Sequence, residues 1–471
     1  MSDFLSIKLD KDSGTPIYQQ LGDALCRLIE EGLLKPNTQL PPIRKMASQL
    51  KINAVTVVSA YKYLEDKRVV YSKMGSGTYV SDLQIRELPE PILKNQYNSP
   101  KRIDFDVKNA INFANSSTST ELFPVEEFKT LFNQVLDRDK GMAFSYQESQ
   151  GYEPLRQAIC VYLEGYGIKT GPDKIQIISG AQQGIDLISK TMLGPGDVLF
   201  VEQPTYYGAV GAFLSRGAQV VEVPLAADGI DLDKLESLLK IYRPKFIYVM
   251  TYFQTPTCIS YSMAKKKSLL ELCYQYNTYI VEEDNQSEFQ YKSEPVTPLK
   301  ALDYKNRVVY IKSFSKILMP GLRLGFMVLP KSILRKTLNS KYTTDIATSG
   351  FIQRAFELYL NGPGWQRQVT YMKSVFRKRY ELAVDSLARH TYGKIGFDPP
   401  EGGLNLWLKI MNPKEKTEEL CNRLVSRNVI VTPGAVFYMS GMEAPFIRLS
   451  FAAVEKYEIE KGVAILGDSL K

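Results

Sequence analysis

The sequence predicts two domains: a small α+β domain of helices and a β-hairpin, followed by a much larger α/β domain. The 471 residues exceed what one hydrophobic core usually holds. Up to residue 80, apolar residues at helical spacing are followed by two strand-like runs, and beyond residue 103 short apolar runs alternate with helical patterns. We therefore expect domains at 12–82 and 103–471, joined by a proline-containing linker at 83–102.

Three helices are expected in the first domain. Residues 17–32 have apolar residues at helical spacing and end at a glycine, and residues 40–47 open a second helix with prolines at its start. After a short connection, Asn53 is expected to cap a third helix that runs from Ala54 to about Asp66. Two helices joined by so short a turn predict a helix-turn-helix.

A hairpin is expected to follow the third helix. Its two strands are predicted at 69–71 and 78–80, where β-branched and aromatic residues gather. Between them, Gly75 and Gly77 permit a tight turn next to a phosphate backbone. The hairpin would complete a winged helix-turn-helix.

The order of these elements closely resembles the DNA-binding domain of the GntR family. The resemblance implies contact with a double-stranded DNA operator by Arg44, Asn53, Ala54, Val55, Thr56, Gly75 and Gly77. The family has Ser-Arg-x-Thr at the start of its recognition helix, whereas this chain has Asn-Ala-Val-Thr, so Ala54 replaces an arginine that would read a guanine. Fewer base contacts would shift recognition toward phosphates, thymine methyl groups and DNA shape. Residues 1–80 carry 11 Lys and Arg against 8 Asp and Glu, a modest net charge of +3.

The most informative stretch of the second domain is Ser313–Gly325, SFSKILMPGLRLG. It follows a β-branched apolar run at 307–311, which predicts a buried strand that ends just before Lys316. Ligands bind at this end of the strands in open α/β sheets. Arg323 follows a Pro-Gly turn and can return to the same pocket to clamp a phosphate, while Ser313 and Ser315 add hydroxyl donors.

Two upstream segments are expected to reach the same pocket. The apolar run 175–178 is followed by a turn and a helical pattern, so the free backbone N–H groups of Gly180, Ala181 and Gln182 would form an anion site at a helix N-terminus. A second strand, 198–201, leads into a proline turn that presents the ring of Tyr206.

From about residue 103 to the C-terminus, this order of motifs resembles the fold-type I aminotransferases, which use pyridoxal phosphate (PLP). The resemblance implies an α/β domain in which Lys316 forms an imine with PLP and the Tyr206 ring stacks on the pyridine. It also implies that Arg448, in PFIRLSFA, holds the carboxylate of an amino acid, and that Tyr146 reaches the phosphate in the partner subunit of a homodimer.

The chain departs from the family where the cofactor site should be completed. Thr255 stands where the family has an asparagine that contacts the phenolic oxygen, and Asn285 stands where it has a tyrosine. The usual aspartate at the pyridine nitrogen corresponds by register to Glu283, with Asp284 as the other candidate. Only one of these two can face the ring, because neighbouring strand residues point to opposite sides. In the family, this carboxylate keeps the pyridine nitrogen protonated and so makes the ring an electron sink. Because this position and the two others are changed in this chain, we expect weak or absent transamination.

Together the two halves resemble the MocR subfamily of GntR regulators. This resemblance implies a PLP-dependent transcriptional regulator that acts as a homodimer and senses a small amino compound, or PLP itself, through Lys316. Two alternatives remain open. One is an active aminotransferase with a fused DNA-binding domain, and the other is a dimeric repressor that has lost the cofactor.

Composition narrows the remaining classes of protein. The N-terminus lacks an apolar secretory core and no apolar run approaches a membrane span, so a cytoplasmic protein is expected. The five cysteines form no CxxC pair and are expected to be reduced thiols of the core. His390 is the only histidine, which argues against multi-histidine metal sites and His-based triads, so no metal is expected.

Overall fold

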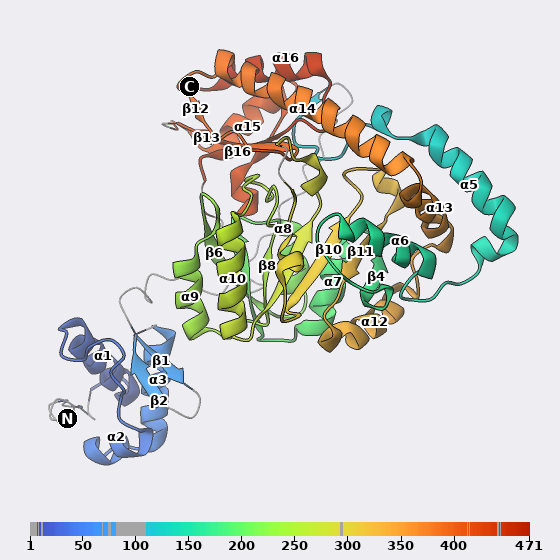
Figure 1. The fold of residues 1–471 in the computed structure, drawn as a ribbon. Coiled ribbons are helices and arrows are strands. Elements are labelled where there is room, and N and C mark those ends of the chain that lie inside the picture. Colours follow the sequence, from blue (N-terminus) through green and yellow to red (C-terminus); the bar gives the residue numbers. More distant parts are fainter. Residues whose placement is uncertain are drawn as a thin grey trace. The chain divides into compact units, whose positions relative to one another are not determined.

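The computed structural model describes residues 7, 9–10, 13–67, 69–73, 77–81, 110–292, 295–411, 413, 415–439, 442 and 444–471. The chain divides into two compact units (Figure 1). One contains Met1–Pro89 together with Asp233–Tyr242, and the other contains Glu90–Leu232 and Arg243–Lys471. The expected linker at 83–102 lies outside the described residues.

The N-terminal segment of the first unit is a winged helix-turn-helix, as the sequence predicts. Its elements are α1 (Ile17–Glu30), α2 (Ile43–Leu50), α3 (Ala54–Asp66), β1 (Val70–Lys73) and β2 (Gly77–Val80). The helices form because each has one apolar stripe, and these stripes meet in a core that includes Leu21, Leu25, Met46, Val57 and Leu64. Strands β1 and β2 pair antiparallel as the wing. Gly77 opens β2 with a φ of 118°, whereas Gly75 lies outside the described residues.

The second unit is built on an eight-stranded sheet with the order β4-β11-β10-β9-β8-β5-β6-β7. The inner pairs β10/β9, β9/β8, β8/β5 and β5/β6 are parallel, while β11 runs antiparallel to both neighbours. The strand bounds are β4 Ile175–Ile178, β5 Val198–Gln203, β6 Gln219–Ala226, β7 Gly229–Ile230, β8 Phe246–Val249, β9 Tyr279–Asp284, β10 Val308–Ser313 and β11 Gly325–Val328.

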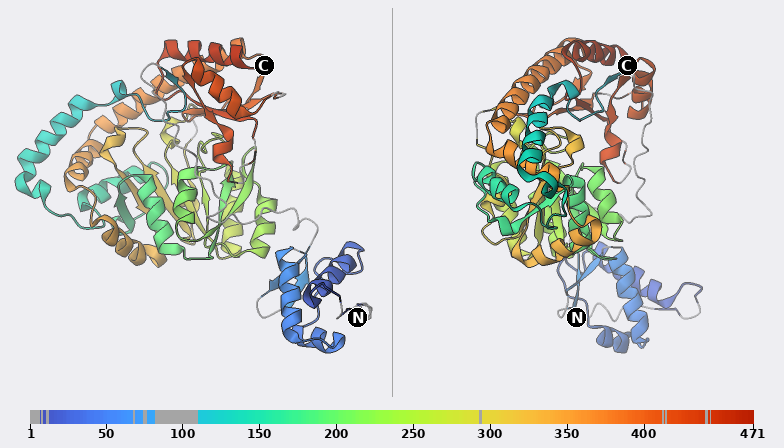
Figure 2. Two further views of the ribbon diagram at one scale, coloured as in Figure 1. Left: turned by 180° about the vertical axis from the view of Figure 1, so that it is seen from behind. Right: turned by 90° about the vertical axis from the view of Figure 1, so that its right-hand side faces the viewer.

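Helices cover both faces of this sheet, as Figures 1 and 2 show. One face packs on α6 (Glu153–Glu164), α13 (Gly350–Asn361) and α14 (Gly364–His390), and the other on α7 (Ala181–Met192) and α8 (Tyr207–Leu214). Within β10, Tyr310 belongs to the first core while Val309 and Ile311 belong to the second. The strands are mainly apolar because both of their faces are buried, and charged residues such as Glu283, Asp284 and Lys312 lie near their carboxyl ends.

A four-stranded antiparallel sheet follows in the C-terminal part, with the order β12-β13-β16-β15. Its strands are β12 Ile395–Gly396, β13 Asn405–Ile410, β15 Thr432–Pro433 and β16 Phe446–Ser450. A separate parallel pair joins β3 (Ile111–Asn112) to β14 (Val429–Ile430). The remaining helices are α5 Val125–Asp139, α9 Leu232–Ile241, α10 Met263–Gln275, α11 Leu299–Leu302, α12 Lys331–Asp345, α15 Thr417–Ser426 and α16 Lys456–Ser469. Short 3-10 helices span Thr120–Leu122, Lys140–Phe144, Pro172–Lys174, Ser287–Phe289, Pro320–Leu322 and Gly434–Phe437.

No disulfide joins the five cysteines, all of which lie among the described residues, and four of the five are buried. His390 is the last residue of α14. Among the described residues, no helix is both long and apolar enough to cross a membrane. The same part of the chain contains no cluster of three or more His, Cys, Asp and Glu side chains placed to hold a metal ion.

Candidate functional site

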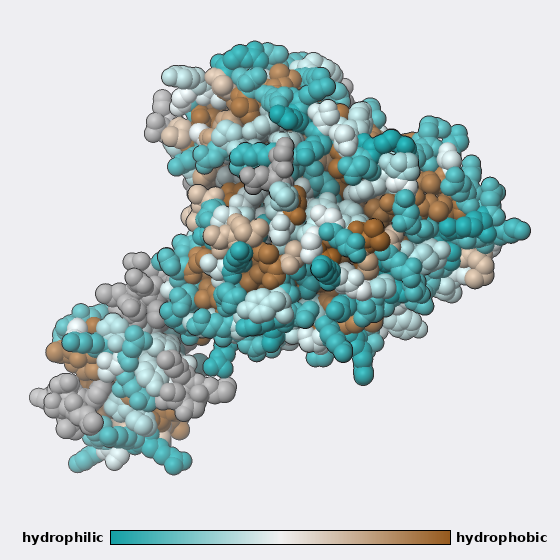
Figure 3. All heavy atoms as spheres, in the orientation of Figure 1, coloured by the Kyte–Doolittle hydropathy of each residue, from teal (hydrophilic) through white to brown (hydrophobic). Residues whose placement is uncertain are grey.

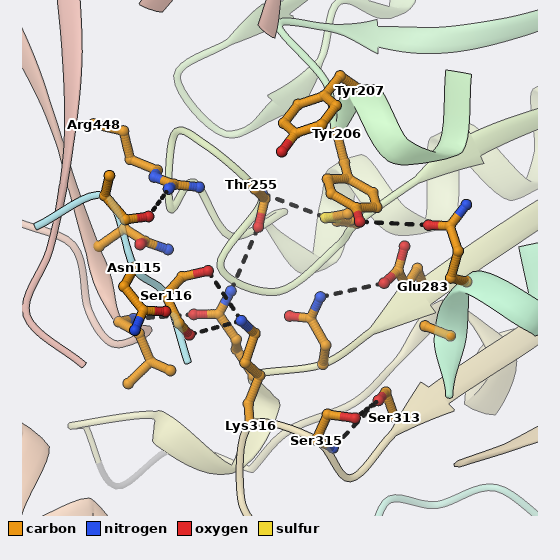
Figure 4. Close-up of a pocket in the computed structure, with 18 of the residues that line it drawn as sticks. Asn115, Ser116, Tyr206, Tyr207, Thr255, Glu283, Ser313, Ser315, Lys316 and Arg448 are labelled. Atoms are coloured by element: carbon orange, nitrogen blue, oxygen red, sulfur yellow. Dashed lines mark hydrogen bonds between the residues drawn. The ribbon is translucent and has the colours of Figure 1, made fainter. Parts of the chain in front are cut away.

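A cavity of about 380 Å³ lies at the carboxyl ends of the central strands of the large sheet (Figure 4). Eleven residues singled out from the sequence line it: Ala181, Gln182, Tyr206, Thr255, Glu283, Asn285, Ser313, Ser315, Lys316, Arg323 and Arg448. They come from segments far apart in the chain. The parallel strands bring them together because their carboxyl ends meet at one edge of the sheet.

Lys316 follows β10 and points into the cavity. Its Nζ donates to the backbone oxygen of Ser116 at 2.6 Å and to the Ser116 hydroxyl at 3.0 Å. The Thr118 hydroxyl in turn donates to the Lys316 carbonyl at 2.6 Å, which fixes the backbone at this position. Burial lowers the pKa of Lys316 to about 8, and the positive charge of Arg448 acts in the same direction while Glu283 opposes it. A substantial share of this amine is therefore neutral, and nucleophilic, near physiological pH.

Arg323 lines the cavity together with Ala181 and Gln182 at the start of α7, and Gly180 lies against the Arg323 guanidinium without lining the cavity itself. The Arg323 Nη2 donates to the carbonyl of Ser179 at 2.8 Å. A Cβ atom on Gly180 would lie 2.5 Å from that same nitrogen, and the φ of Gly180 is 88°. Only glycine leaves room for the guanidinium here, and the helix begins at the next residue. Free N–H groups at the start of α7 and the guanidinium together suit a phosphate.

The two serines of the lysine segment, Ser313 and Ser315, also line the cavity. The Ser313 hydroxyl donates to the Ser315 hydroxyl at 3.1 Å and accepts from the backbone N–H of Ser315 at 3.3 Å. They therefore add hydroxyl groups to the cavity that Arg323 also lines, as the sequence predicts.

Glu283 and Asp284 point in opposite directions from the end of β9. Glu283 lines the cavity, where it accepts hydrogen bonds from the Tyr248 hydroxyl and from Asn285 Nδ2. Burial raises the pKa of Glu283, and hydrogen bonds from Tyr248 and Asn285 only partly offset that effect. Asp284 lies behind the cavity wall, so of the two candidates only Glu283 faces the ligand space.

Asp284 belongs to a buried charge cluster, which we define as Asp284, Glu288 and Lys312. Lys312 Nζ lies 3.1 Å from Asp284 and 2.8 Å from Glu288, and its side chain is completely buried. Strand pairing places Lys312 directly beside Asp284. Burial alone would lower the pKa of Lys312, but the two carboxylates more than compensate and raise it. Lys312 thus stays protonated, and the cluster joins the ends of β9 and β10.

Aromatic and amide side chains surround the middle of the cavity. The Tyr206 hydroxyl donates to Gln182 Oε1 at 3.4 Å, and Gln182 Nε2 donates to the carbonyl of Gly208 at 2.8 Å. Gln286 Nε2 lies 3.5 Å from the Thr255 hydroxyl. Gln286 Oε1 accepts from the backbone N–H of Leu404 at 3.0 Å, so this glutamine connects the large sheet to the segment before β13.

Arg448 enters the cavity from β16 of the small sheet. Its Nη2 donates to the carbonyl of Ala114 at 2.7 Å and to the Thr432 hydroxyl at 3.0 Å. Among the described residues, no acceptor lies within hydrogen-bonding distance of its buried Nε. Burial lowers the pKa of Arg448, which is the mark of a cation short of counter-charge. A carboxylate in the cavity would supply both the missing acceptor and the negative charge.

Eight further residues line the cavity without having been predicted: Ala114, Asn115, Ser116, Tyr207, Met250, Gln286, Leu404 and Asn405. Most lie in loops, and no local pattern in the sequence marks them. Tyr207 is the exception, because its position directly after Tyr206 was a signal in the sequence. Tyr146 is not in the cavity but on the surface, with 89% of its side chain exposed.

In the first unit, the predicted DNA-contacting residues lie at the start of α2, around the start of α3 and in the wing. Arg44 is exposed in the first turn of α2. Asn53 caps α3 by accepting from the backbone N–H of Val55 at 3.0 Å. Val55 is exposed, while Ala54 and Thr56 are partly covered.

The cavity's side chains fit PLP on three observations. Gly180 leaves space for Arg323 where a Cβ would exclude it, Glu283 is a buried carboxyl with a raised pKa, and Lys316 is a buried amine with a lowered one. A phosphate, a pyridine nitrogen and an aldehyde are the groups that these three positions would accept.

Family models match both parts of the chain. The model of aminotransferase class I and II matches residues 108–466, and the model of bacterial regulatory proteins of the gntR family matches residues 17–80. Among solved structures, the α-aminoadipate aminotransferase LysN of Thermus thermophilus, complexed with N-(5'-phosphopyridoxyl)-L-leucine, is 32% identical with a TM-score of 0.72. The match covers 77% of this chain and 92% of that one.

Two relatives represent the two kinds of similar protein, an aminotransferase and a transcriptional regulator. Aromatic-amino-acid aminotransferase 1 of Thermococcus litoralis is 30% identical over 372 residues, which cover 78% of this chain and 89% of the relative. The probable rhizopine catabolism regulatory protein MocR of Rhizobium meliloti is 27% identical over 467 residues, which cover 97% of this chain and 94% of that protein. With a GntR domain, an aminotransferase class I and II domain and end-to-end similarity to MocR, the chain belongs to the MocR subfamily of GntR-type transcriptional regulators.

Proposed function

We propose that this regulator holds PLP at Lys316 and senses a small amino compound that carries a carboxylate. The observation that carries the proposal is the convergence of Lys316, Glu283 and Arg448 on one cavity. Figure 4 shows Lys316 directed toward Ser116, with Arg448 and Glu283 on different sides. An amine, a carboxyl and a guanidinium so placed match the groups of an amino acid and of PLP.

The geometry supports the following assignment of residues that would hold PLP. Arg323, Ser313, Ser315 and the start of α7 at Gly180–Gln182 would bind the phosphate, Tyr206 would lie against the ring, and Glu283 would face the pyridine nitrogen. When bound, PLP would supply an aldehyde for amines and an electron-withdrawing ring. Tyr146 lies outside the cavity and would serve the partner subunit in a homodimer.

The chain's own groups would select the effector. Neutral Lys316 keeps its lone pair available at the cavity centre, and Ser116 orients its Nζ through two hydrogen bonds. The unmatched Nε of Arg448 would donate to a carboxylate and place the amine of the same molecule toward Lys316. Binding of such a molecule would then alter how the DNA-binding unit binds its double-stranded DNA operator.

Catalytic turnover is expected to be low. Glu283 has the longer arm of a glutamate, and its side chain is engaged with Tyr248 and Asn285. Thr255 and Asn285 present a hydroxyl and an amide where the family has an amide and a phenol. These changes keep polar groups around the ring and alter those that would move protons during transamination.

The test uses purified full-length protein, incubated with PLP and dialysed, beside K316A. A visible absorbance band retained by the wild type alone, altered by amino acids without keto-acid production, supports a sensor. Sustained keto-acid formation on the order of 1 per second or faster would instead indicate an aminotransferase. Absence of any retained PLP would overturn the proposal and leave a DNA-binding protein without a cofactor.

Gly180→Ala is expected to weaken PLP binding at least about tenfold. The new Cβ would come within 2.5 Å of Arg323 Nη2 and displace the guanidinium from the phosphate end of the cavity. Loss of one charge-assisted hydrogen bond corresponds to about 10- to 100-fold in affinity. The measurement is an absorbance titration with PLP.

Gly196→Ala is the matched control for this substitution. Gly196 also has a positive φ, of 80°, but a Cβ atom added there would meet nothing within 4 Å. We expect G196A to bind PLP with nearly wild-type affinity. Equal loss in both variants would show that backbone strain, and not the clash with Arg323, weakens binding.

A further inference from the structure

The outward face of α3 is apolar in a way that the fold does not require. Its inner face, with Val57, Ala60 and Leu64, fills the core of the unit. On the opposite side Val55 is 67% exposed and Val58 is 48% exposed. Figure 3 shows a few hydrophobic areas on the otherwise mostly hydrophilic surface of this unit. Valine is a weak helix former, so two exposed valines in one turn do not serve helix stability.

The same face is poor in groups that read bases by paired hydrogen bonds. Arginine and lysine read guanine, and asparagine and glutamine read adenine through two bonds at once. Position 54 is alanine, and Asn53 already uses its Oδ1 to cap the helix at Val55. A capping Asn53 cannot offer its oxygen and its amide together to one adenine.

Basic side chains are exposed on α2, on α3 and in the turn between them. Arg44 and Lys45 are exposed at the start of α2, Lys51 is exposed in the turn between the helices, and Lys62 is exposed one turn beyond Val58. Exposed cations on these elements together with exposed valines on α3 match the chemistry of a major groove, where phosphates border the base edges. Thymine alone presents a methyl group there.

We propose that α3 reads the C5-methyl groups of thymines through Val55 and Val58, so that each operator half-site carries thymines at the positions facing these two residues. The inference rests on the proposed function in that the partner is operator DNA. It deepens that function by naming which base the helix selects and by which chemical group. Phosphate contacts by Arg44, Lys45, Lys51 and Lys62 supply the affinity that carries no sequence information.

The experiment first removes the C5-methyl group of thymine from the DNA and then removes the valine methyl groups from the protein. Full-length protein loaded with PLP first selects duplexes from a random double-stranded pool at physiological salt. Each thymine of the selected duplex is then replaced singly by deoxyuridine, which lacks only the methyl group. We expect about fourfold weaker binding at one or two positions per half-site, as burial of one methyl group predicts.

Protein variants assign those positions. Val55→Ala and Val58→Ala should each weaken binding to the thymine duplex, and each should abolish the thymine preference at one position. Lys62→Ala should weaken binding to thymine and uracil duplexes equally. Leu33→Ala, at a residue that is 57% exposed outside α3, should change neither.

The outcomes separate this inference from the proposed function. Selected duplexes bound equally well with uracil at every position, or lacking thymines altogether, would overturn methyl reading while leaving a DNA-binding regulator in place. Failure to retain any duplex would contradict the DNA-binding function itself, and this inference with it.

Discussion

Lys312→Met is expected to lower the free energy of unfolding of the second unit by about 3–5 kcal/mol, because removing one partner of a buried ion pair leaves uncompensated charge. Lys312 is completely buried between Asp284 and Glu288, so its loss leaves two carboxylates together without a cation. Both tryptophans of the chain, Trp365 and Trp407, belong to the second unit. Tryptophan fluorescence during urea unfolding therefore reports that unit alone, which avoids treating two units as one transition.

Lys292→Met is the matched control for the buried cluster. Lys292 pairs with Glu401 at the surface, where the two side chains are 58% and 53% exposed. Exposed pairs contribute about 0–1 kcal/mol, so this variant should unfold nearly as the wild type does. The loss in K312M should also shrink as the pH falls, since protonation of Asp284 would remove one of the two orphaned charges. A similar midpoint for both variants at neutral pH would show that the cluster contributes no more than a surface pair.

We expect Lys316 to form the proposed imine with PLP faster than an ordinary lysine would, because its pKa is lowered. With a pKa of about 8, compared with the usual 10.5, roughly one Lys316 amine in ten is neutral at pH 7. An ordinary lysine would be neutral about 300 times less often. We expect the rate of attachment to Lys316 to rise with pH up to about 8 and then level off. Borohydride trapping followed by mass spectrometry measures that rate.

Two neighbours should move this midpoint in opposite directions. The Arg448 charge lowers the pKa of Lys316, so R448M should shift the midpoint to higher pH, and Glu283 raises that pKa, so E283Q should shift it lower. The position of the midpoint distinguishes this electrostatic effect from a mere loss of affinity. A rate that continues to rise to pH 10 in the wild type would contradict a depressed pKa.

Much of the fold follows from local patterns in the sequence. The apolar runs that lie between predicted turns indicated the strands β4 and β10. Helical spacing of apolar residues, together with the Asn53 cap, predicted α3 with its observed bounds. Alternation along β9 implied that only one of Glu283 and Asp284 can face the ligand space. It could not say which, because the answer depends on Lys312, which lies beside Asp284 only through pairing between strands.

The parts that local patterns missed depend on loops that the sheet brings together. Ser116 reaches Lys316 across 200 positions of sequence, and Gln286 reaches Leu404 across 118. Their side chains are of common polar types, so nothing near them in the sequence distinguishes them from surface residues. The buried cluster was missed for the same reason. Lys312 lies in a strand that is otherwise mainly apolar, and Glu288 lies in the short 3-10 helix that follows β9.

Lys316 and Arg448 belong to different sheets, since one follows β10 and the other lies on β16. We expect a molecule with both an amine and a carboxylate to bind the two residues together and so to connect the large and small sheets. A decarboxylated analogue can engage Lys316 alone. A ligand shifts a conformational equilibrium only by its differential affinity for the two conformations. The amino acid should therefore change the affinity of the regulator for DNA. The simple amine should occupy the cavity as a competitor and leave DNA affinity as it was, which a competition experiment with both compounds would test.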